Sequence, residues 1–470
     1  MRKTAVYVAL LAVMSSSFVT VLNTNMTHVI SPNLVEAFEL DYSRLTWIFT
    51  SYQIIYAVLM PVFGKLGDRS GRRRCLLVGL CVFGLGSLLS GLSWNYASLV
   101  AFRVLQGIGA SAIFPNATVL ATSLFPPEHR GKIMGIWGMT VSLGSVTGPS
   151  IGGLIVRYLG WKSIFFVNAP CALLAMTAIM LATRSDSTTL DSFRFDTKGA
   201  VLLLMMVVTL VTVIQNGPTM GWASPSVILM LLVLTVSVPS FVLVENRITD
   251  PLIDPKTLTN KTFLAGIYCG GMHLVAIQGM HFLMPLFMGQ VLGLDPLTIG
   301  ILMAPQAAIR LVVSPIAGVL EDKYTSRIPV TVGIVVRSIA LASFAYLTQE
   351  SSRTFLTLSL LLDGVGAALI WSPSINAVLK SYPRDMAAYV TGVYNMIRFV
   401  MGVVGVGLIG LVLDKNYSAD FVSNSPVPGY YQSYIVLAGV TALGLLFVKS
   451  LGKQADFVGS QTQARRMSVQ

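Results

Sequence analysis

One stretch decides how this chain is organised: Gly64-Lys-Leu-Gly-Asp68-Arg69-Ser-Gly71-Arg72-Arg73-Arg74. It joins two long apolar runs, and its second half pairs a glycine that permits a tight turn with arginines that favour the anionic-lipid side of a membrane. Part of it recurs 254 residues later, where the matching positions read Gly318, Leu320, Asp322 and Lys323. Duplicated halves of this kind are typical of transporters.

The composition around this stretch is that of a protein whose solvent is largely lipid. Of the 470 residues 54% are hydrophobic and 11% are charged, and the mean hydropathy is +0.73. Globular domains carry about 25% charged residues, so an ordinary soluble protein is excluded. Since a membrane helix needs about 20 apolar residues, the length suits twelve to fourteen spans. Apolar runs fall near 5–30, 44–63, 75–94, 96–120, 133–156, 161–182, 199–216, 224–244, 263–289, 297–320, 327–348, 354–379, 386–413 and 431–450.

These runs predict an all-α integral membrane protein with fourteen transmembrane helices. We expect a six-helix bundle at 1–182, a linker with two additional helices at 183–260, a second six-helix bundle at 261–450 and a disordered cytoplasmic tail at 451–470. The net charge of +12 comes from basic residues scattered in short loops, which indicates membrane orientation rather than nucleic-acid binding. Both termini are predicted to be cytoplasmic, in the cell membrane.

The Gly64–Arg74 stretch closely resembles the motif between the second and third helices of the major facilitator superfamily. In that family the motif latches an inner gate, which implies this role for Gly64, Asp68, Arg69, Gly71 and Arg72, with Asp322 in the second copy. A plain positive-inside turn would account for the arginines. It would not account for the glycine and aspartate spacing or for the copy.

A second resemblance lies in the fifth predicted helix, Gly144-Ser-Val-Thr-Gly148-Pro149-Ser-Ile-Gly152-Gly153, which is similar to the antiporter motif of the same superfamily. Small residues at four-residue spacing let two helices approach closely, and generic packing would use them too. The segment Trp161–Pro170, the Thr46-Trp47 pair and the extra helix pair further resemble the fourteen-helix drug:proton antiporter branch, the multidrug efflux type.

The fourth predicted helix carries Arg103-Val-Leu-Gln106-Gly-Ile-Gly-Ala, which looks like the family motif with a buried arginine facing the central cavity. An echo, Asp363-Gly-Val-Gly-Ala, stands in the fourth helix of the second half. The resemblance places Arg310, Asp363 and Arg398 around the same cavity, opposite Arg103. An ionisable residue inside a membrane is functional by default.

One departure concerns Asn23, which stands where that branch usually carries an aspartate. Asn cannot titrate, so Asp363 becomes the first proton-coupling candidate, followed by His281 and His273, which lie about two helical turns apart. Two alternatives to these proton-coupling roles are open. Asp363 could only pair with Arg337 or Arg398 to cancel charge, and the histidines could only contribute to packing. Met284 belongs to a methionine stripe that suits either a pocket for varied apolar ligands or a lipid-facing surface.

Together these features predict a secondary active transporter that exports amphiphilic small molecules by alternating access, coupled to protons. The alternative is an exporter of an anionic metabolite or lipid with different or no proton coupling. A membrane-embedded enzyme or a sensor leaves the gate-like motifs unexplained. We expect no enzymatic activity, no cofactor, no metal and no nucleic-acid partner, and a monomer whose partners are substrate, protons and the bilayer.

Overall fold

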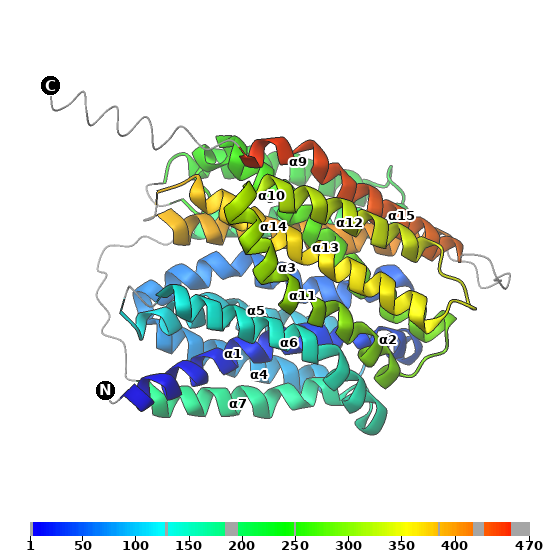
Figure 1. Cartoon of the computed structure of the whole chain (residues 1–470), viewed down its shortest axis with the longest axis horizontal. Coiled ribbons are helices and arrows are strands. Elements are labelled where there is room, and N and C mark those ends of the chain that lie inside the picture. Colours follow the sequence, from blue (N-terminus) through cyan, green and yellow to red (C-terminus); the bar gives the residue numbers. More distant parts are fainter. Residues whose placement is uncertain are drawn as a thin grey trace.

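The computed structural model describes residues 3–126, 130–183, 196–248, 251–383, 386–416 and 427–452. The regular structure of these residues is helical, and fourteen of the helices are long and apolar enough to cross a membrane, which confirms the predicted fold class. The long helices run side by side in a bundle (Figure 1). From Lys453 onward the expected disordered tail lies outside the described residues.

The first half comprises seven helices: α1 (Lys3–Val29), the short α2 (Ser31–Phe38), α3 (Tyr42–Ser70), α4 (Arg72–Gly91), α5 (Tyr96–Ser123), α6 (Arg130–Leu159) and α7 (Ser163–Ala182). The extra pair is α8 (Thr197–Met220) and α9 (Pro225–Glu245). The second half comprises α10 (Lys261–Leu286), which continues into a π-helical turn at Phe287–Val291, then α11 (Pro296–Tyr324), α12 (Arg327–Ala345), α13 (Arg353–Lys380), α14 (Ala387–Asn416) and α15 (Pro428–Leu443).

The observed helices extend beyond the apolar runs, and this changes the local structure of the Gly64–Arg74 motif. Because α3 continues to Ser70 and α4 begins at Arg72, the motif is helical except at Gly71, whose φ is 95°. Thr325, which stands 254 residues after Gly71, turns the chain between α11 and α12 with a φ of 75°. The repeat therefore includes the backbone conformation of the turn, although Thr rarely adopts a positive φ.

The repeat also shows in how the fourth membrane-spanning helix of each half packs, α5 in the first half and α13 in the second. A Cβ at Gly107 of α5 would lie 2.7 Å from a backbone oxygen of α3, and a Cβ at Gly364 of α13 would collide with the backbone of α11. Two residues on, Gly109 and Gly366 meet the backbones of α4 and α12 in the same way. Only glycine allows these close approaches, so both halves have the same helix frame.

The two halves meet along α3 with α14 and along α6 with α11. We call the end that bears Gly71 and Thr325 the basic end, and the opposite end the sealed end. At the sealed end the carboxylate of Asp414 on α14 accepts hydrogen bonds of 2.7 Å from the backbone amides of both Tyr42 and Ser43, which begin α3. This contact ties the first turn of α3 to the last turn of α14.

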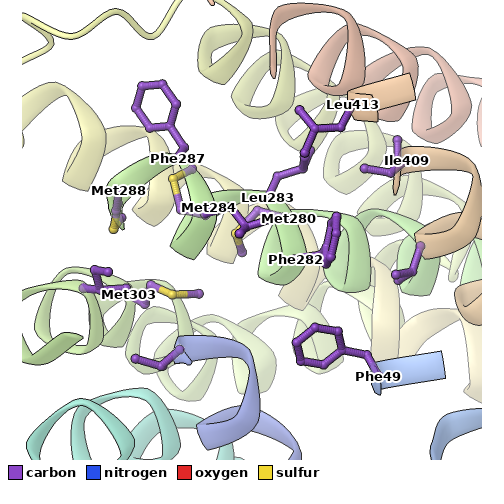
Figure 2. Close-up of a cluster of buried hydrophobic side chains, with 14 of the residues drawn as sticks. Phe49, Met280, Phe282, Leu283, Met284, Phe287, Met288, Met303, Ile409 and Leu413 are labelled. Atoms are coloured by element: carbon purple, nitrogen blue, oxygen red, sulfur yellow. The ribbon is translucent and has the colours of Figure 1, made fainter. Parts of the chain in front are cut away.

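A large apolar plug fills the space between the halves near the sealed end. Its side chains come from α3, α10, α11 and α14 (Figure 2), among them Phe49, Met280, Phe282, Leu283, Met284, Phe287, Met288, Met303, Ile409 and Leu413. Met280, Met284 and Met288 are each 0% exposed. They face neither lipid nor water in this state, because the plug encloses them.

Along α6 and α11 the halves touch at the sealed end and separate toward the basic end. A Cβ at Gly153 of α6 or at Gly300 of α11 would collide with the backbone of the other helix. Gly135 and Gly318 lie 18 residues, or five helical turns, from these positions and so on the same faces. A Cβ at either would meet no described atom within 4 Å. Among the described residues, α6 and α11 are therefore apart at these two positions near the basic end.

The extra helix α8 packs beside the seam between α3 and α14. Its Gln215 amide donates to the Thr50 hydroxyl of α3 at 3.3 Å, and Gly407 of α14 leaves room for that same side chain. Asn216 accepts a hydrogen bond of 3.3 Å from the indole of Trp47. The extra pair thus lies against both halves, with α9 on its outer side.

Candidate functional site

The candidate site consists of buried polar side chains within the membrane-spanning helices of both halves. In the first half they form the amide cluster: Asn23 of α1, Ser87 of α4, Arg103 and Gln106 of α5, and Asn168 of α7. The Asn23 carbonyl accepts from Gln106 at 3.2 Å and from Asn168 at 2.7 Å. Within the described residues this cluster contains no acid, and the Asn23 amide nitrogen has no partner.

Arg103 is the only charge of the amide cluster and is 1% exposed. Its Nε donates to the backbone oxygen of Ile48 at 3.1 Å, its Nη1 donates to Gln106, and its guanidinium lies 4.3 Å from the Tyr52 ring centroid. A carbonyl, an amide and a ring thus replace the counter-charge that Asn23 cannot provide. The cluster holds its arginine in place by hydrogen bonds that do not depend on a titrating group.

In the second half the corresponding group is the carboxylate cluster: His273 and His281 of α10, Gln306 of α11, Arg337 of α12 and Asp363 of α13. Arg337 and Asp363 are both 0% exposed and form an ion pair with an Nε to Oδ1 distance of 3.0 Å. Gln306 donates to the other carboxylate oxygen at 2.7 Å. Both oxygens of Asp363 accept hydrogen bonds, so the geometry suits the ionised carboxylate.

The two histidines predicted as coupling candidates join this network at opposite ends. Arg337 Nη1 lies 2.7 Å from His273 Nδ1 and also donates to the His273 carbonyl at 3.0 Å. Since arginine can only donate, His273 Nδ1 accepts and the ring is neutral here. His281 Nε2 lies 3.4 Å from Gln306 Oε1, the amide that holds Asp363. One chain of contacts therefore links all three coupling candidates.

A histidine that sequence reasoning missed stands across the seam. His28 of α1 is 2% exposed and stacks on Phe49 at 4.9 Å, and its ring centroid is 5.7 Å from that of His281. The chain has only four histidines, and three of them lie in membrane-spanning helices. The rarity of histidine outside the membrane-spanning helices could have pointed to His28 as a functional residue. Gln306 could have been found in the same way, because it is a single amide in an apolar helix.

Two further arginines, Arg398 and Arg310, were predicted to face the cavity. Among the described residues, neither forms an ion pair with Asp363. Arg398 of α14 is 2% exposed, and its guanidinium lies 3.6 Å from the centroid of the Trp371 ring. Arg310 of α11 is half-buried. Met284 lies within the plug, where the Tyr434 hydroxyl is 3.8 Å from its sulfur.

The antiporter-like motif, Gly144–Gly153, brings α6 into contact with two other helices. Gly144, Gly148 and Gly152 face α1, where a Cβ at Gly148 would lie 2.6 Å from Asn25 and one at Gly152 would lie 3.1 Å from the Met26 backbone. Gly153 and Pro149 instead meet α11 of the other half. The motif therefore packs α6 within its own half and across the seam.

The gate-like motif is held within its own half. Arg72 forms an ion pair with Asp68 and donates to the carbonyl of Gly64 at 3.0 Å, while Arg69 is exposed. In the second half the anchored carboxylate is Glu321, which accepts from Asn376 and from Lys380 of α13 at 2.9 Å each. Asp322 lies in α11, and its side chain is outside the described structure.

Comparison with known proteins identifies the family. The family model for the Major Facilitator Superfamily matches residues 13–406. The chain is 30% identical over 403 residues to the multidrug resistance protein Stp of Mycobacterium tuberculosis, covering 86% of this chain and 75% of that one. It is 26% identical to the riboflavin transporter RibZ of Clostridioides difficile, covering 96% and 98%.

Solved structures agree in fold. A bacterial homolog of the human lysosomal transporter Spinster, in an inward-facing and unoccupied conformation, matches with a TM-score of 0.66 at 17% identity and covers 96% of this chain and 95% of that one. Two halves with a shared helix frame, buried charges within the membrane-spanning helices and a family match over most of the chain lead to one conclusion. The protein is a multi-pass membrane transporter that belongs to the major facilitator superfamily.

Proposed function

We propose that this transporter exports amphiphilic small molecules by alternating access and that protons moving inward drive the export. The basic end would face the cytoplasm, since loops rich in Lys and Arg stay on that side. Both termini would then be cytoplasmic, and the sealed end would face outward. In this arrangement the structure corresponds to the inward-open state of a monomer in the cell membrane.

The observation that carries the proposal is the contact of Asp363 with Arg337 and Gln306, in a chain whose halves meet at the end that would face outward. An antiporter that exports must release its proton inside before it takes up substrate. The inward-open state should therefore hold a deprotonated carrier, which is the form that the Arg337 and Gln306 contacts of Asp363 suit. Protonation of Asp363 would weaken both contacts. Each charge that crosses about 100 mV gains roughly 2.3 kcal/mol.

The substrate class is supported by the relatives and by the plug. Relatives named for multidrug resistance span most of this chain. Methionines are flexible and polarizable, which suits contact with varied apolar molecules once the plug opens. Met280, Met284 and Met288 would then line part of the substrate path.

A second candidate function is export of an anionic metabolite or lipid without proton coupling. The amide cluster favours it, because Asn23 supplies no titrating group and Arg103 is left as a net positive charge. The two candidates differ in whether protons move with the substrate.

The test measures substrate-induced proton movement in proteoliposomes with an imposed pH gradient, across cationic and anionic amphiphiles. Wild type is compared with Asp363→Asn and with the double variant His273→Ala, His281→Ala. Asp363→Asn combined with Arg337→Gln removes both buried charges and so separates lost coupling from lost folding. Glu36→Gln, at an exposed acid of α2, is the matched control.

Proton movement that accompanies the substrate in wild type and in Glu36→Gln, and that disappears in both Asp363 variants, is the expected result. The transported molecule should be recovered chemically unchanged. Transport that continues in wild type with no proton movement would reject proton coupling and leave the second candidate.

A further inference from the structure

Arg398 is a buried charge that no ion pair among the described residues neutralises. It is 2% exposed, its Nε and Nη1 have no hydrogen-bond partner, and it takes part in no ion pair among the described residues. A guanidinium stays charged at any physiological pH, and burying it without acceptors is costly. The Nε and Nη1 donors of Arg398 therefore lack a well-placed acceptor among the described residues.

Aromatic rings surround this guanidinium. Its central carbon lies 3.6 Å from the ring centroid of Trp371, 5.5 Å from that of Tyr394 and 5.6 Å from that of Phe399. Cation–π contacts offset part of the burial cost but use the faces of the group and leave its N–H donors unfilled. Trp371 is itself 40% exposed.

A second unfilled donor lies beside the first. The Tyr394 hydroxyl faces the Arg398 guanidinium, its own O–H has no acceptor among the described residues, and Tyr394 is 0% exposed. A Cβ at Gly270 of α10 would collide with this hydroxyl and would lie 3.4 Å from Arg398 Cδ. The glycine thus leaves room for both side chains at one place, and their donors converge there.

Arg103 shows that this fold satisfies a buried arginine when the arginine serves packing. The same two nitrogens, Nε and Nη1, donate there to a backbone oxygen and to Gln106. The Nε and Nη1 atoms of Arg398 have no equivalent acceptors, although the residue is buried to a similar degree. The difference points to a ligand rather than to a structural role.

We propose that Arg398, Tyr394 and Trp371 form a subsite for a carboxylate or other oxyanion attached to an aromatic ring. The oxyanion accepts from the Arg398 guanidinium and the Tyr394 hydroxyl, and the ring lies against Trp371 and Phe399. Phe399 packs on Tyr56 of the first half at 5.3 Å, so the subsite lies at the seam where substrate would pass. This inference rests on the proposed transport function, whose substrate class it narrows.

The experiment is equilibrium binding to the purified full chain in lipid nanodiscs, without any gradient. The probes are anthracene-2-carboxylate and its uncharged amide, followed by their own fluorescence. Wild type should bind the acid about tenfold more tightly than the amide, because a charge-assisted bidentate contact is available only to the acid. Arg398→Met should reduce the acid to the affinity of the amide, and Tyr394→Phe should cause a smaller loss.

Thermal unfolding of the same samples serves as the control for correct folding. Arg398→Met removes an unpaired buried charge and should leave the melting temperature unchanged or raised, whereas a structural arginine would lower it. Arg69→Met, at an exposed arginine of the basic end, should change neither acid binding nor melting. Equal affinity of wild type for acid and amide, or unchanged acid binding in Arg398→Met, overturns the inference.

The outcome is independent of the test of proton coupling. Asp363→Asn combined with Arg337→Gln should keep the preference for the acid while losing coupled transport. Coupled export of cations with no acid preference would leave the proposed function standing and reject the subsite. An acid preference without coupled export would support the subsite and the second candidate function.

Discussion

The amide cluster and the carboxylate cluster occupy equivalent places in the two halves, and only the second contains an acid. Gln106 and Asp363 begin the same glycine pattern, and the glycines after each pack against corresponding helices. Arg337, the partner of Asp363, stands 254 residues after Phe83, an apolar core residue of α4. The acid and its cation are therefore present together in one half and absent together in the other.

This difference separates a fixed region from one that can change its charge. Hydrogen bonds between amides and an arginine do not depend on pH, so the amide cluster keeps its form throughout a transport cycle. A buried ion pair responds when its carboxylate takes a proton, because the partner cation then loses its counter-charge. The carboxylate cluster is accordingly the part that protonation can switch.

The largest expected effect comes from breaking the buried pair. Asp363→Asn should lower the free energy of unfolding by about 3–5 kcal/mol, because Arg337 would stay buried without a counter-charge. The Nη2 atom of Arg337 already has no hydrogen-bond partner among the described residues. Asp363→Leu combined with Arg337→Met should recover most of the loss. Denaturant unfolding in detergent measures both, and equal stability of the single variant and wild type would contradict a stabilising pair.

A smaller effect is expected from giving the amide cluster an acid. The Asn23 carbonyl accepts two hydrogen bonds and its amide nitrogen has no partner, so Asn23→Asp fits with little loss. The new carboxylate near Arg103 should shift the ratio of cation to anion transport toward cations by about tenfold. Uptake assays with matched amphiphiles measure this ratio. An unchanged ratio would show that the amide cluster does not face the substrate.

The smallest effect concerns an exposed ion pair that joins the halves at the sealed end. Arg157 of α6 and Asp295, which begins α11, lie 3.5 Å apart with side chains 50% and 43% exposed. Solvent screens such pairs, so Arg157→Gln should change the free energy of unfolding by less than about 1 kcal/mol. A larger loss in the same unfolding assay would mean that the seam depends on surface charge.

The pH dependence of this pair has a definite sign. The Thr298 hydroxyl, backbone amides and Arg157 lower the pKa of Asp295. A lowered pKa adds stability above the unfolded value of about 3.9, and this contribution is lost only as the pH falls through the folded pKa. The contact is therefore constant between about pH 5 and 8. A change of transport in that range would therefore not come from this contact.

Much of the fold was predictable because a bilayer limits the choices. Fourteen apolar runs correspond to fourteen helices, since a chain in lipid must satisfy its backbone hydrogen bonds within each span. The repeat of Gly64–Arg69 located the two halves, and the structure extends it to the turn at Thr325. The short helix α2 was missed because its eight residues are too few to form an apolar run.

The site was predictable in its residues but not in its contacts. Mid-span charges such as Asp363 and Arg398 stand out against apolar neighbours in any membrane helix. Their partners lie 26 and 27 residues away on other helices, Arg337 for Asp363 and Trp371 for Arg398. Nothing local in the sequence distinguishes Arg337 from Arg398 as the partner of Asp363.

The sequence by itself determined the number of spans, the two-fold repeat, the family motifs and the residues that carry charge into the membrane. Periodicity, hydropathy and glycine spacing are local properties, and the bilayer converts them directly into helices. Only the tertiary structure decided that Asp363 pairs with Arg337, that Met280, Met284 and Met288 lie in a plug, and that Arg398 and Tyr394 lie together beside Gly270. These facts depend on how separate helices rotate and pack against one another, which no single helix encodes.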